Sequence, residues 1–149
     1  MDNQGKEVSK LDKFLEKDKK KHRAEFVVSI IFNIILYYVA NNLLNWNISF
    51  IAPTFANVLW IVNYFLLAAI IINLIFIFYH PNWFRNLLHV VIDVLFIITA
   101  YTFFTVFPFI VGEGLAIALK ILIALVIVAS VISLIIHVVR FILLLIYRD

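Results

Sequence analysis

The chain alternates between long apolar segments and short polar ones. Four apolar runs cover approximately residues 25–44, 55–79, 87–107 and 115–147. Each run is long enough to cross a bilayer, which takes roughly 20 helical residues. A lone strand in lipid would leave its peptide groups unpaired, so the runs predict helices. The pattern therefore predicts an all-α integral membrane protein, a bundle of four transmembrane helices.

The connectors between these runs are short and carry turn or interface residues. Pro53 is suited to starting a helix, Pro81 interrupts one, and Gly112 lies in the third connector. Trp83 is typical of a membrane–water interface. Short connectors make successive helices antiparallel neighbours.

Composition supports the membrane assignment. Hydrophobic residues make up 65% of the 149 positions and charged residues 14%, whereas soluble domains are nearer to half and a quarter. The chain has no cysteine, which excludes disulfides, thiolate catalysis and Cys-ligated metal centres. We expect a multi-pass protein of the cell membrane.

Charge divides the chain into residues 1–23, a basic tail, and residues 24–149, the four-helix transmembrane domain. Eight of the twelve Lys and Arg residues lie in the tail. With antiparallel helices, Arg85 and Arg140 fall on the same side of the membrane as the tail. Lys120 is the exception to this distribution of charge, but it is close enough to the other side of the membrane to extend its amine there. The positive-inside rule then predicts that both termini are cytoplasmic.

The tail has two interpretations. It is either a solvated segment that sets the topology or an interfacial helix that contacts anionic lipid headgroups. The basic residues that would make such contacts are Lys17, Lys19, Lys20, Lys21 and Arg23.

Ionisable residues inside the spans are costly in hydrocarbon and need partners. His89 and Asp93 are one helical turn apart on the third span, and His137 and Arg140 are similarly spaced on the fourth. Counting inward from the cytoplasmic ends puts these residues at one depth in the membrane. The sequence predicts a buried polar network, which serves the fold or forms an ion or proton site, made of Asp93, Arg140, His89, His137, Asn33, Asn73, Ser130 and Ser133.

An ion pair between Asp93 and Arg140 is the simplest way to accommodate both charges. The fourth span is about 50 Å long at the helical rise, against a hydrocarbon core of about 30 Å. If the core instead runs from Lys120 to Arg140, Arg140 lies at the interface and reaches inward to pair.

The favoured function is a small non-enzymatic membrane protein, a structural, regulatory or accessory subunit that forms a homo-oligomer or joins a partner membrane protein. One alternative is an oligomeric ion- or proton-coupled transporter or channel that uses Asp93. A second is a haem protein with His89 and His137 as axial ligands; otherwise we expect no cofactor and no metal. The sequence contains no nucleotide-binding or hydrolase motif, and no basic face indicates nucleic acid.

Overall fold

The computed structural model describes residues 2–147, with side chains described at residues 5, 6, 9 and 22–147. The elements in chain order are α1 (Asp2–Asn42), the 3-10 turn η1 (Pro53–Phe55), α2 (Ala56–Phe78), α3 (Asn82–Val106) and α4 (Glu113–Ile146). Residues 2–147 form no strand beyond one isolated bridge. The prediction of an all-helical chain is confirmed.

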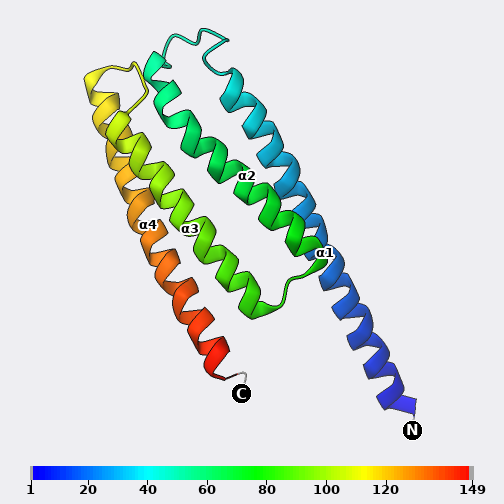
Figure 1. Ribbon diagram of the computed structural model, residues 1–149. Coiled ribbons are helices and arrows are strands. Elements are labelled where there is room, and N and C mark those ends of the chain that lie inside the picture. The colour runs from blue at the N-terminus through cyan, green and yellow to red at the C-terminus, as the bar shows by residue number, and fades with distance from the viewer. Residues whose placement is uncertain (1, 148–149) are drawn as a thin grey trace.

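Four helices are long and apolar enough to cross a membrane, as predicted. The segment of α1 that qualifies is His22–Asn42. The helix runs without interruption from the basic tail into this segment, so both belong to one element (Figure 1). Both termini lie at the same end of the molecule (Figure 1).

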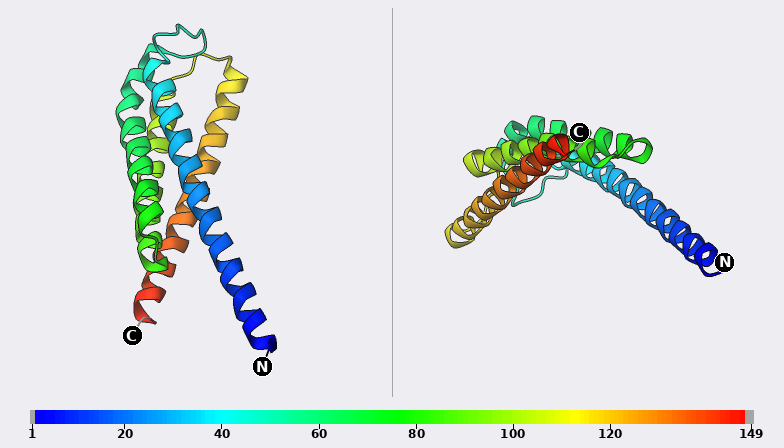
Figure 2. Two further views of the ribbon diagram at one scale, coloured as in Figure 1. Left: turned by 90° about the vertical axis from the view of Figure 1, so that its right-hand side faces the viewer. Right: turned by 90° about the horizontal axis from the view of Figure 1, so that it is seen from below.

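The helices pack in chain order, α1 on α2, α2 on α3 and α3 on α4. Within the described residues no extensive contact joins α1 to α4. Seen from below, the row is curved and open on one side (Figure 2). The four antiparallel helices predicted from the sequence therefore form an open layer.

The core of the protein follows α2, because this helix has neighbours on both sides. Its buried residues are Val58, Ile61, Leu66, Ala69, Ile72 and Phe76. By contrast, Ser130 is the one buried residue of α4. Phe76 connects α2 to both neighbouring helices. The centre of its ring lies 5.4 Å from that of the Phe26 ring on α1 and 5.6 Å from that of the His89 ring on α3.

The first and third connectors meet at the end of the molecule opposite the termini. Ala52 N–H donates to the Pro108 carbonyl at 3.0 Å, and Ile110 N–H donates to the Phe50 carbonyl at 2.8 Å. These bonds flank an antiparallel bridge between Ile51 and Phe109. The α1–α2 hairpin is thereby tied to the α3–α4 hairpin through backbone groups.

Candidate functional site

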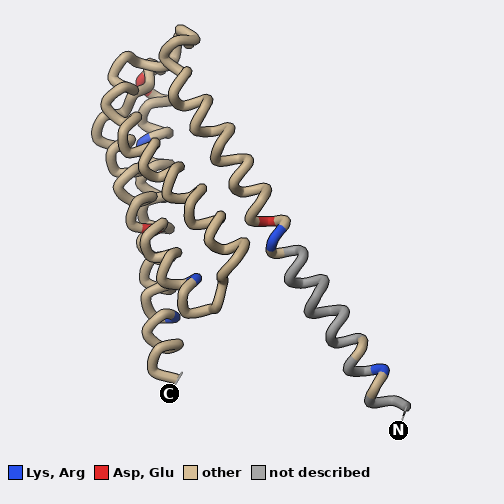
Figure 3. Tube along the Cα trace, turned by 45° about the vertical axis from the view of Figure 1, so that its right-hand side comes forward, with Lys and Arg blue, Asp and Glu red and all other residues tan. Residues whose placement is uncertain are grey.

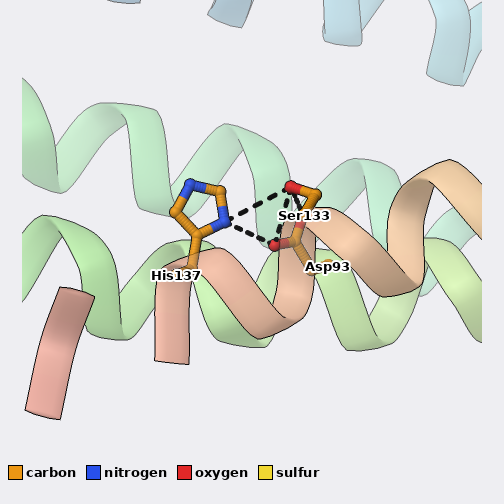
Figure 4. Close-up of polar contacts among 3 residues, drawn as sticks. All are labelled: Asp93, Ser133 and His137. Atoms are coloured by element: carbon orange, nitrogen blue, oxygen red, sulfur yellow. Dashed lines mark hydrogen bonds and ion pairs between the residues drawn. The ribbon is translucent and has the colours of Figure 1, made fainter. Parts of the chain in front are cut away.

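Three polar side chains meet between α3 and α4. The contact between His137 Nδ1 and Asp93 Oδ2 measures 2.6 Å. Ser133 Oγ donates to both oxygens of the Asp93 carboxylate, at 3.4 and 3.2 Å. The side chains of Asp93 and His137 are only 16% and 21% exposed. Figure 4 shows the carboxylate facing the hydroxyl and one nitrogen of the imidazole.

Helical spacing explains why α4 supplies two of these groups. Ser133 and His137 are four residues apart, so their side chains lie on one face of the helix. That face packs on α3, where Asp93 lies near mid-helix. A carboxylate in apolar surroundings needs donors, and α4 presents two of them one turn apart.

His89 adds a fourth group from α3. Its ring is stacked on that of His137, with centroids 4.9 Å apart and planes 14° from parallel. On another side its ring lies against Phe76. His89 therefore extends the cluster toward α2 by ring contact.

The cluster contains Ser, His and Asp but lacks the geometry of a nucleophilic triad. In such a triad the serine bonds to one ring nitrogen and the carboxylate to the other. Here Ser133 Oγ lies 3.4 Å from His137 Nδ1, the nitrogen that also contacts Asp93. The second ring nitrogen points away from both partners (Figure 4). The histidine therefore cannot pass a proton from the serine while the carboxylate orients it.

The two histidines also differ from a haem-ligating pair. Axial ligation requires two imidazole nitrogens that approach one iron from opposite sides of the porphyrin. The rings of His89 and His137 instead meet face to face. Among the described residues, no group of three His, Cys, Asp or Glu side chains could hold a metal ion.

Three other residues of the predicted network bond to their own helices. Asn33 Nδ2 donates to the Ser29 carbonyl, and Asn73 Nδ2 donates to the Ala69 carbonyl. Ser130 Oγ likewise donates to the carbonyl of Val126. Because the helices form an open row, Asn33 on α1 is separated from α3 and α4 by α2. The network is thus smaller than the sequence predicts and belongs to the α3–α4 hairpin.

Arg140 is the largest departure from the predicted network. Asp93 bonds to Ser133 and His137, and the described residues contain no ion pair between Asp93 and Arg140. Arg140 instead lines a pocket with Asn82 and Asn86 at the start of α3. Helix α4 thus extends beyond the start of α3. Counting inward from the two helix ends had placed Arg140 too deep.

The predicted headgroup contacts of the tail lie mostly outside the described side chains. These residues are Lys17, Lys19, Lys20 and Lys21. Arg23 is described, and it is exposed on α1. Its position is compatible with headgroup contact.

The sequence analysis missed a second polar contact between helices. Asn41 Nδ2 donates to Asn63 Oδ1 at 2.8 Å, and Asn63 Nδ2 donates back to Asn41 Oδ1 at 3.1 Å. The two amides join α1 to α2. Both lie within apolar runs, so a search for neutral polar residues in the spans would have found them. Only the path of the connector determines that they face each other.

No family model matches the chain, and no curated protein or solved structure is significantly similar to it. The functional argument therefore depends on the chain's own residues and geometry.

Proposed function

We propose that the chain is a small, non-enzymatic, multi-pass protein of the cell membrane that acts as a structural, regulatory or accessory subunit. The exposed surface supports insertion in a bilayer. Large apolar side chains are exposed along α1, α2 and α4, among them Phe32, Leu67, Leu125 and Ile135. Soluble proteins rarely expose contiguous apolar surface on this scale, whereas lipid chains would cover it.

The distribution of charge supports an orientation with both termini in the cytoplasm. Arg85 lies near the start of α3 and Arg140 near the end of α4, whereas Glu113 is the first residue of α4. Figure 3 shows basic positions, in blue, toward the end of the molecule that carries the termini, and an acidic position, in red, at the opposite end. Lys120 Nζ lies 5.1 Å from the centre of the Phe107 ring. Its amine is thus directed toward the third connector and away from the apolar middle of α4.

The observation that carries the proposal is that Asp93, Ser133 and His137 satisfy one another's hydrogen-bonding groups. Their hydrogen bonds are made to one another, across the α3–α4 contact. Polar side chains of this kind join membrane helices. Among the described residues, the open row also leaves α1 and α4 with one extensive helical neighbour each. This favours association with a second copy or another membrane protein.

The test compares stability with transport in the full-length chain. We expect Asp93→Asn to lower the midpoint of thermal unfolding in detergent. We also expect proton flux in proteoliposomes to equal that of empty vesicles for the wild type and the variant alike. Val91→Ala, on the exposed side of α3, is the control and should leave both readouts unchanged. Unaltered stability in Asp93→Asn would contradict a role in joining α3 to α4.

Proton-coupled transport remains a second candidate because His89, His137 and Asp93 form a continuous chain of titratable groups. Histidine can exchange protons near neutral pH. This candidate predicts proton flux above that of empty vesicles, and loss of the excess in Asp93→Asn. Such a result would replace the proposal of an accessory subunit.

The orientation can be tested directly because the chain has no cysteine. Single cysteines replace Gly5, near the start of α1, and Asn47, in the first connector; both residues are exposed. We expect a membrane-impermeant maleimide to label Asn47→Cys in intact cells and Gly5→Cys only after permeabilisation. The reverse labelling pattern would show that the topology is inverted. Labelling of both cysteine variants in intact cells would argue against a multi-pass arrangement.

A further inference from the structure

A pocket of about 350 Å³ lies between the first turns of α3 and the last turns of α4. It is lined by Asn82, Arg85, Asn86, Arg140, Leu143 and Leu144. The pocket is separate from the cluster around Asp93, which contributes no residue to it. The start of α3 and the end of α4, which line it, lie toward the end of the molecule that carries both termini (Figure 1).

The pocket carries positive charge, and the described residues that line it include no acidic side chain. Arg85 comes from α3 and Arg140 from α4. Among the described residues neither arginine forms an ion pair. Arg85 Nη2 donates a long bond, 3.5 Å, to Asn82 Oδ1. Guanidinium groups are planar, multiple donors that match the oxygens of a phosphate.

The start of α3 adds to this field. The helix begins at Asn82 after Pro81, and no side chain caps it. Its first backbone N–H groups lack partners within the helix and carry a partial positive charge. Helix N-termini of this kind favour phosphate groups, and here the N-terminus coincides with two arginines.

An adjoining pocket makes the site amphipathic. It has a volume of about 220 Å³, shares Asn82 and Leu144 with the first pocket, and adds Trp83 and Tyr147. Trp and Tyr are typical of the headgroup level of a bilayer. Polar groups on α3 thus lie beside leucines and aromatic rings, as a molecule with a charged head and apolar chains requires.

We propose that this pocket, with Arg85 and Arg140 as its cationic groups, binds the phosphate of an anionic phospholipid from the leaflet on the side of the termini. Basic pockets between membrane helices on the cytoplasmic side bind anionic headgroups. The leucines and aromatic rings favour a lipid over a soluble phosphate. The proposal rests on the proposed membrane insertion, and it concerns a site apart from the basic tail.

Trp83 provides the readout because it lies in the adjoining pocket. Trp46→Phe and Trp60→Phe leave it as the only tryptophan, and both replaced side chains are about half exposed, at 49% and 54%. The full-length protein is placed in phosphatidylcholine vesicles that contain brominated phosphatidylglycerol or, at equal mole fraction, brominated phosphatidylcholine. We expect the anionic lipid to quench Trp83 more strongly. Arg85→Gln and Arg140→Gln should each lower the relative affinity about fivefold, and together about 25-fold.

Arg23→Gln is the matched control, because it removes the same charge from an exposed position on α1. It should keep the preference for the anionic lipid. A preference lost equally in Arg23→Gln, or retained in the double variant, would overturn the site. Quenching by neither brominated lipid would instead contradict membrane insertion, and equal quenching by both would contradict only the site.

Equilibrium dialysis separates a lipid from a soluble anion. We expect the wild-type protein in neutral detergent to bind no more inorganic phosphate than the Arg85→Gln variant does. Phosphate binding that depends on both arginines would reassign the pocket to a soluble ligand and overturn the lipid proposal.

Discussion

Each of the two helical hairpins has a polar contact between its own two helices, and the two contacts differ in chemistry. Asn41 and Asn63 join α1 to α2 through two reciprocal bonds between neutral amides. Asp93 joins α3 to α4 through Ser133 and His137, in a contact that requires a proton between carboxylate and imidazole. The first contact involves neutral amides alone, whereas the second contains two ionisable side chains.

This difference separates a purely structural contact from one with chemical capacity. An amide pair can satisfy its donors and acceptors but cannot titrate. The α3–α4 contact instead contains a carboxylate and an imidazole, and a second imidazole, that of His89, is stacked on the first.

The largest expected effect comes from Phe76, which joins the two hairpins. Its side chain is 1% exposed and its ring packs against Phe26 and His89. Phe76→Ala would leave a cavity between α1 and α3, and we expect it to lower the free energy of unfolding by about 3–5 kcal/mol. Equilibrium unfolding in mixed micelles measures this loss. Phe78→Ala, at a position 82% exposed on the same helix, should change it by less than about 0.5 kcal/mol.

A double-mutant cycle on Asp93 and His137 is expected to give the next largest effect. The coupling free energy between Asp93→Leu and His137→Leu should be about 1–2 kcal/mol, within the upper range for polar contacts between membrane helices. The same cycle with Arg140→Leu should show no coupling, because Asp93 bonds to His137 and Ser133. A larger coupling to Arg140 than to His137 would restore the ion pair that the sequence predicted.

The amide pair should give the smallest effect. We expect the coupling between Asn41→Leu and Asn63→Leu to be about 0.6 kcal/mol, the average for such contacts. It should be smaller than the coupling of Asp93 to His137. Asn42→Leu is the control, since the side-chain amide of Asn42 donates to the carbonyl of Tyr38 in its own helix. An amide coupling as large as that of Asp93 to His137 would remove the contrast between the hairpins.

Part of the candidate site could be predicted from the sequence. Asp93, His89, His137 and Ser133 were identified because polar residues in an apolar run need partners, and the 3.6-residue period shows which of them share a helix face. The open row separates Asn33 from the cluster. Counting from the helix ends gave Asp93 the wrong partner, because α4 extends past the start of α3.

The sequence by itself determined the number and type of the helices, because the length of each apolar run and the need to satisfy backbone groups in lipid are local properties. The tertiary structure decided the register between helices and their order in the layer. These depend on side chains from different helices packing together, as at Phe76, and on connectors whose paths no periodicity encodes. For the same reason only the structure brings Arg85 and Arg140 to one pocket and places Asn41 opposite Asn63.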